Sequence, residues 1–158
     1  AGVAASLAQR DHTTVARLDP ERLVRTLAER RHLISFFNEL KVDAVKPAVV
    51  AAQYFGTRGF FHEYQAALDR PLGHALARVW AAGYAQLVAG KLDGNEQARA
   101  VATAAQADDP PITAAEFVAL LPAQSSVAPP GTELQPKQSL GRGAALEILW
   151  QALPSLRR

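Results

Sequence analysis

Residues 69–90 read DRPLGHALARVWAAGYAQLVAG and predict a long helix that ends at Gly90. The start signal is Asp69-Arg70-Pro71, because proline fits the first turn of a helix, where its missing amide is not needed. The residues that share one face at helical spacing are large and apolar or very small: Leu72, Leu76, Val79, Trp80, Gly83 and Leu87. This stripe marks the buried side of the helix.

The rest of the sequence also favours helix. Alanine makes up about a fifth of the residues and clusters with leucine, arginine, glutamate and glutamine, which are good helix formers. Further helices are predicted to start at Asp19 with Pro20 and at Pro47. Thr113 and Glu116 fit a capping box, in which the hydroxyl accepts a first-turn amide and the glutamate reaches back.

Other segments complete the expected fold. Residues 33–37 are rich in β-branched and aromatic side chains and predict a short strand or extended segment. A turn is predicted at 93–95, followed by helices over 96–107 and 139–153. The expected fold class is mainly α, an irregular bundle of about six to seven helices with one extended segment near 33–37.

Prolines divide the chain. Four of them lie between residues 122 and 138 together with serines and a glycine, a composition that predicts an extended linker. We therefore expect a helical domain over 1–123, a Pro/Ser-rich linker over 124–138, and a C-terminal helix within 139–158 that packs back on the domain. The chain does not begin with methionine, which indicates a processed piece or one domain of a longer protein.

The composition excludes several classes of site. Cysteine is absent, so disulfides, thiolate metal sites and a cysteine nucleophile are excluded. The four histidines lie 20, 30 and 12 residues apart, so none forms the close pair that binds metal from one helix face: His12, His32, His62 and His74. A formal net charge of +2 gives no reason to expect nucleic acid as a partner. No apolar run approaches the roughly 20 residues of a transmembrane segment.

Aromatic side chains concentrate between residues 54 and 64. One interpretation is that they form the main core of the domain. The other is an interaction surface for a partner, with these candidate residues: Tyr54, Phe60, Phe61, His62 and Tyr64. His62 and Glu63 also offer a general acid or base, although no nucleophile is near them in sequence, and a polar pair at a loop rim is the simpler interpretation.

Arginines occur in two settings that favour anions. Two are flanked by glycines, in Gly56-Thr57-Arg58-Gly59 and Gly141-Arg142-Gly143, where a phosphate could be held. Neither segment matches a phosphate-loop or dinucleotide fingerprint, so turn glycines are the simpler interpretation. Arg25, Arg30 and Arg31 make a basic helix face, which we interpret as solvated.

Three predicted helices open alike, at Leu72-Gly73-His74-Ala75, Ile112-Thr113-Ala114-Ala115 and Leu140-Gly141-Arg142-Gly143. In each, a branched aliphatic residue precedes small or polar residues and then a large apolar cluster, as in a hydrophobic staple. The spacings of 40 and 28 residues are too uneven for a solenoid, so related hairpins in a compact bundle are expected. The pattern is similar to S-layer homology modules, and the copy at Ile112 matches them best. This resemblance implies a non-enzymatic module that binds a cell-wall polymer or a protein.

The beginning of the chain resembles another family. The segment AGVAASLA, residues 1–8, is followed by Leu18-Asp19 and a leucine-rich helix over 23–27. This order is similar to the C-terminal end of the flavin domain in a family of FAD-dependent oxidoreductases, some of which carry a further helical region with a segment like QYFGTRGFF, residues 53–61.

The second resemblance implies a place for the first helix. In that family a small-residue helix packs its start against bound FAD, so residues 1–10 would be the end of a flavin-domain helix. The residues near the cofactor would be Gly2, Val3, Ala4 and Ala5. The family's glycine-rich dinucleotide fingerprint is absent here, so the chain alone is not expected to hold FAD. Its partner would be an upstream flavin-binding domain of the same polypeptide.

Two hypotheses follow for function. In the first, the chain is the C-terminal helical part of an FAD-dependent oxidoreductase, not catalytic by itself, which covers the substrate side or mediates assembly. In the second it is the S-layer-like interaction module. A dinucleotide-binding segment encoded upstream would favour the first, and a signal peptide with further copies of the helix opening would favour the second. The sequence leaves catalytic residues, compartment and homo-oligomer formation open.

Overall fold

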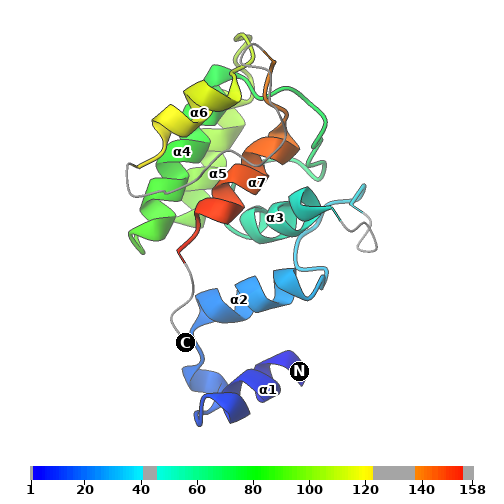
Figure 1. Ribbon diagram of the computed structural model, residues 1–158, viewed down its shortest axis with the longest axis vertical. Helices are drawn as coiled ribbons and strands as arrows, with labels where there is room; N and C mark the ends of the chain where they lie inside the picture. The colour runs from blue at the N-terminus through cyan, green and yellow to red at the C-terminus, as the bar shows by residue number, and fades with distance from the viewer. Residues whose placement is uncertain (1, 41–45, 123–137, 155–158) are drawn as a thin grey trace.

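The computed structural model describes residues 2–40, 46–122 and 138–154, which form an irregular bundle of α-helices (Figure 1). In chain order the elements are α1 (Gly2–Arg10), the short 3-10 helix η1 (Val15–Arg17), α2 (Pro20–Glu29), α3 (Pro47–Gly56), α4 (His74–Val88), α5 (Gly94–Ala104), α6 (Ala114–Leu120) and α7 (Arg142–Ala152). Bridges between extended residues occur in these ranges only as isolated pairs. The prediction of a mainly helical bundle is confirmed.

The predicted helix starts are confirmed by their caps. The Asp19 carboxylate accepts a hydrogen bond of 3.0 Å from a first-turn amide, and Pro20 is the first residue of α2. Pro47 likewise begins α3. Before α6, Thr113 and Glu116 form a complete capping box, with the Thr113 amide donating to the carboxylate at 2.8 Å. The same bonds lower the pKa of the Glu116 carboxyl, because they favour its ionised form.

The three similar helix openings meet in a closed ring. The Leu72 amide donates to the Leu140 carbonyl, the Ile112 amide to the Leu72 carbonyl, and the Leu140 amide to the Ile112 carbonyl, each at 2.8 Å. All three side chains are buried. Because these residues immediately precede α4, α6 and α7, the ring fixes the starts of three helices relative to one another. The likeness of the three openings therefore reflects equivalent places in the fold.

The centre of the core is aromatic. Tyr54 and Phe55 of α3, Phe60 after it and Trp80 of α4 all have 0% exposure. The Trp80 indole nitrogen donates to the Phe60 carbonyl at 2.9 Å, which satisfies its one polar atom inside the core. α7 packs along α3, where the Trp150 ring meets the Tyr54 ring edge-on with centroids 5.3 Å apart (Figure 1).

A glycine lets α4 and α5 approach each other closely. A Cβ at Gly83 would lie 2.5 Å from atoms of the buried Gln97 side chain. The Gln97 amide in turn donates to the Val79 carbonyl at 3.3 Å. The absent side chain at this position of the predicted stripe therefore makes room for a polar group of the neighbouring helix.

Residues 33–37 form no strand; their backbone is irregular. The amides of Ile34 and Ser35 both donate to Oε1 of the buried Gln53, each at 3.0 Å. A glutamine side chain of α3 thus takes the hydrogen bonds that a neighbouring strand would have taken. Phe37 is buried, whereas Phe36 is 84% exposed.

Several boundaries differ from the prediction. The residues at 93–95 are not a separate turn, because α5 begins at Gly94 and the Asp93 carboxylate caps it. The last helix begins at Arg142, later than predicted, and Leu72 lies before α4 rather than in it. In both places the backbone of the preceding residues is used by the ring of helix openings. Apart from Gln138, the predicted linker over 124–138 lies outside the described residues.

Candidate functional site

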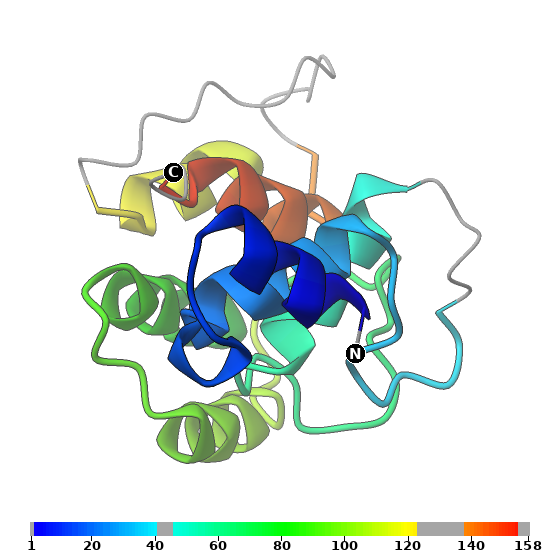
Figure 2. The same ribbon diagram turned by 90° about the horizontal axis from the view of Figure 1, so that it is seen from below.

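Residues 2–29, which comprise α1, η1 and α2, form an N-terminal arm at one end of the molecule (Figure 1). α1 packs against η1 and α2, and α2 packs against α3. Seen from this end, α1 is the outermost helix (Figure 2). The segment that resembles the end of a flavin domain is therefore held away from the main core.

α1 has two faces of different character. The packed face contains the half-buried Val3 and Ala4 and the buried Leu7 and Ala8, which repeat at helical spacing. The exposed residues of α1 are Gly2, Ala5, Ser6, Gln9 and Arg10, the last residue of the helix. Of the four residues predicted near a cofactor, the structure thus puts Gly2 and Ala5 on the outer face and Val3 and Ala4 on the inner one.

The first turn of α1 is open to approach. Apart from its chain neighbours and the backbone of α1, no described atom lies within 4 Å of the place that a Cβ on Gly2 would occupy. Gly2 also lacks the positive φ that would require glycine for the backbone. Nothing in the described residues therefore crowds this turn, whose free amides carry partial positive charge.

Glu21 fastens the arm to the core. Its carboxylate accepts hydrogen bonds from the Tyr54 hydroxyl and the Arg58 guanidinium, and that guanidinium lies 5.5 Å from the centre of the Tyr54 ring. Burial and the neighbouring carboxylate raise the pKa of Tyr54 well above its usual value. Arg58, one of the two glycine-flanked arginines, is therefore already paired.

A second attachment corrects the interpretation of the basic helix face. Arg25 lies over the Trp150 ring, 5.1 Å from its centre, and donates to the Pro154 carbonyl at 2.7 Å. It is a packing residue that joins α2 to the end of α7. Only Arg30 and Arg31 of the predicted face are exposed.

The Tyr54 contact predicts a pH effect that Tyr54→Phe removes. An unfolded tyrosine ionises near pH 10, whereas the folded protein keeps Tyr54 neutral to higher pH. This contribution to stability is fully present below about pH 10 and is lost as the pH rises towards the folded pKa. Urea unfolding between about pH 9 and 11 should therefore show a steeper loss of stability for the wild type than for Tyr54→Phe.

The exposed Tyr64 provides the matched control for this experiment. Tyr64→Phe should keep the steep pH dependence of the wild type. Parallel curves for the wild type and Tyr54→Phe would contradict the assignment.

The aromatic segment supplies the core rather than the predicted surface. Tyr54 and Phe60 are completely buried, so an interaction surface cannot include them. Phe61 is half-buried against the core, whereas His62 and Tyr64 are exposed. For these last three residues, contact with a partner stays a prediction.

The histidines do not assemble a reactive group. His62 Nε2 lies 3.0 Å from a Glu63 carboxylate oxygen in a pair at the surface. His74 Nδ1 lies 2.8 Å from the Pro110 carbonyl oxygen. Within the described ranges, no three or more His, Asp or Glu side chains gather in a way that could hold a metal ion. None of the helices in those ranges combines the length and apolar character of a membrane-spanning segment.

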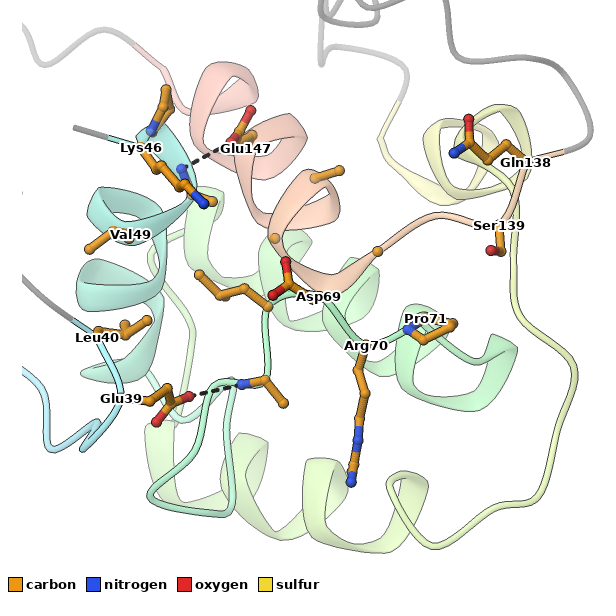
Figure 3. A pocket seen from close by; sticks show the side chains of 17 residues that line it. Glu39, Leu40, Lys46, Val49, Asp69, Arg70, Pro71, Gln138, Ser139 and Glu147 are labelled. Atoms are coloured by element: carbon orange, nitrogen blue, oxygen red, sulfur yellow. Dashed lines mark hydrogen bonds between the residues drawn. The ribbon is translucent and has the colours of Figure 1, made fainter. Parts of the chain in front are cut away.

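An open cleft lies between the N-terminal ends of α3 and α7 (Figure 3). Its volume is about 1120 Å³, and its walls come from the segments 39–40, 46–49, 67–71 and 138–147. These segments share no motif and come from three separate parts of the sequence, so no sequence pattern indicates the cleft.

Two of the three carboxylates that line the cleft, Glu39 and Glu147, have structural partners. Glu39 accepts a hydrogen bond of 3.0 Å from the Ala67 amide, and Glu147 accepts one of 3.0 Å from the Ala48 amide (Figure 3). Each holds a loop or helix start in place. The described part of the molecule thus offers surfaces and a cleft, without an assembled nucleophile and base.

Comparisons with known proteins found no match among family models, curated proteins or solved structures.

Proposed function

We propose that the chain is the C-terminal helical part of an FAD-dependent oxidoreductase and that α1 lies against a flavin-binding domain of the same polypeptide. The observation that supports this proposal is the exposed face of α1, where Gly2, Ala5 and Ser6 follow one another at helical spacing. A helix at the end of a molecule normally turns long polar or charged side chains outward. On this face α1 carries no long polar or charged side chain before Gln9.

The small side chains on the exposed face of α1 allow close contact with a neighbouring group. Without long side chains, a neighbouring backbone or a cofactor can approach the axis of α1, and the open first turn at Gly2 offers amides to an anionic group. Attachment of the arm through Glu21 and Arg25 would hold this face in a defined position on the helical bundle.

The residues of this chain fit contact with FAD, and they do not fit binding of the whole cofactor. The glycine-rich fingerprint that cradles a dinucleotide is absent from the sequence. Bound FAD would supply the redox chemistry of the parent enzyme. The outer face of α1 would approach the cofactor, and the bundle would exclude water from it, cover the substrate side or mediate assembly.

Flavin content tests the proposal. The purified chain alone should carry no flavin chromophore, whereas the polypeptide extended upstream to the start of its gene should carry FAD in stoichiometric amount. Absorbance spectra and release of the flavin by denaturation measure both. A stoichiometric yellow chromophore in the chain alone, or an extended polypeptide without flavin, would contradict the proposal.

One observation favours the second candidate, an S-layer-like interaction module. The three helix openings that resemble such modules occupy equivalent places in the ring formed by Leu72, Ile112 and Leu140. A module of this kind should sediment with purified cell walls and be released by soluble cell-wall polymer. The gene would then encode a signal peptide and more copies of the opening, without a dinucleotide-binding segment.

A further inference from the structure

One glycine-flanked arginine has no role in the contacts described above. Arg58 is paired with Glu21, but Arg142, the first residue of α7, forms no ion pair with any described residue. Its Nε atom is buried and has no hydrogen-bond partner among the described residues, which is also true of Nε in Arg25 and Arg58. An unpartnered donor on a half-buried guanidinium is costly, because this N–H has lost water without gaining an acceptor.

A second arginine lies directly opposite. Pro71 and Gly141 form an antiparallel bridge, and the next backbone bond along it joins the Arg142 amide to the Arg70 carbonyl at 2.9 Å. Arg70 and Arg142 are therefore neighbours in space, and the positive charge of Arg70 acts on Arg142.

No carboxylate of the described residues forms an ion pair with Arg70 or Arg142. Arg70 extends away from the carboxylates of the cleft (Figure 3). Burial and the positive charge of Arg70 lower the pKa of Arg142, while the negative charge of Glu63 acts in the opposite direction. Glu63 itself is paired with His62 at 3.0 Å.

We propose that Arg70 and Arg142 form a binding site for a phosphoryl dianion at the rim of the cleft. Two adjacent guanidinium groups match the charge of a dianion and can each donate two parallel hydrogen bonds to its oxygens. Arg70 lines the cleft together with Gly141 and Gly143, so the cleft has room for the rest of a molecule that carries the phosphoryl group. This site does not depend on the flavin proposal.

Titration of the chain with inorganic phosphate at constant ionic strength tests the site. Phosphate should bind saturably and shift the Nε–H resonance of Arg142, and acetate should bind at least about tenfold more weakly because it carries one charge. Arg142→Gln should weaken phosphate binding about tenfold or more, and Arg70→Gln by about fivefold or more. Glu63→Gln should strengthen it, because a competing negative charge is removed.

Control variants distinguish phosphate binding at this site from effects of overall charge and from loss of folding. Arg99→Gln removes an exposed arginine of α5 and should leave phosphate affinity unchanged. Arg142→Lys keeps the charge and the aliphatic stem, so a folded variant with about tenfold weaker binding supports bidentate recognition. The proposal would be overturned if the resonance shifts did not saturate with phosphate. It would also be overturned if Arg142→Gln bound phosphate as tightly as the wild type, or if Arg99→Gln lost as much affinity as Arg142→Gln.

Vesicles distinguish the source of the phosphoryl group. If vesicles that contain phosphatidic acid bind the chain with the same dependence on Arg70 and Arg142, the ligand is a lipid headgroup. If only the soluble phosphate binds with that dependence, the ligand is a free phosphorylated molecule. Vesicle binding that is unchanged in both variants counts against the site as a lipid-binding surface.

Discussion

Trp80→Ala is expected to lower the free energy of unfolding by about 3–5 kcal/mol. Trp80 has 0% exposure and packs against Phe60 and Phe61, with ring centroids 6.3 and 5.5 Å away. Removing the indole leaves a cavity in a close-packed core and also leaves the buried Phe60 carbonyl without its donor. Both effects destabilise the folded state.

Urea unfolding of the variant and the wild type measures this effect. Val88→Ala is the matched control on the same helix, because Val88 is 42% exposed and its truncation should change stability by less than about 0.5 kcal/mol. A change below about 1 kcal/mol for Trp80→Ala would contradict the central place of this residue in the core.

Gly59→Ala is expected to have the next largest effect on stability. Gly59 has a φ of +79°, a left-handed conformation that L-residues adopt at a cost of about 1–2 kcal/mol. A Cβ there would also lie 2.2 Å from the Gly94 carbonyl oxygen at the start of α5. Because the clashing atom belongs to the backbone, it cannot move without displacing the helix start. We expect a total loss of about 2–5 kcal/mol.

Gly90→Ala separates the two causes. Gly90 also has a positive φ, +67°, but no atom lies within 4 Å of its Cβ position. It should therefore show only the conformational cost of about 1–2 kcal/mol. If thermal or urea unfolding gave equal losses for both glycines, the close contact between the loop after α3 and the start of α5 would be contradicted.

The features of the fold that could be predicted from the sequence are local ones. Asp19, Pro47 and the capping box at Thr113 act on backbone within one turn, so their signals can be read from neighbouring residues. The backbone conformation of residues 33–37 could not be predicted in this way, because it depends on the side chain of Gln53 in a later helix.

The three similar helix openings also show that contacts between distant segments could not be predicted. The likeness of the three openings was visible in the sequence, and their buried aliphatic residues agree with it. Their pairing into a ring was not, since backbone hydrogen bonds between segments distant in sequence leave no spacing rule. For this reason the predicted first residues of α4 and α7 were wrong.

For the candidate sites, too, local features could be predicted from the sequence and contacts between distant segments could not. A helical repeat of 3.6 residues is enough to separate Gly2 and Ala5 from Val3 and Ala4, but which face is packed depends on α2 and η1. The burial of Tyr54 and the pairing of Arg70 with Arg142 both come from contacts between distant segments. The sequence indicated an aromatic core and glycine-flanked arginines without showing these partners.

The outer face of α1 is proposed to lie against a flavin-binding domain. Ala5→Leu adds bulk at an exposed position of that face, and Ala100→Leu makes the same change at an exposed position of α5. Both should leave the unfolding of the chain by itself almost unchanged. In the polypeptide extended upstream, Ala5→Leu should lower the FAD bound per chain about tenfold, whereas Ala100→Leu should retain it. Full FAD occupancy in Ala5→Leu would contradict the proposed contact.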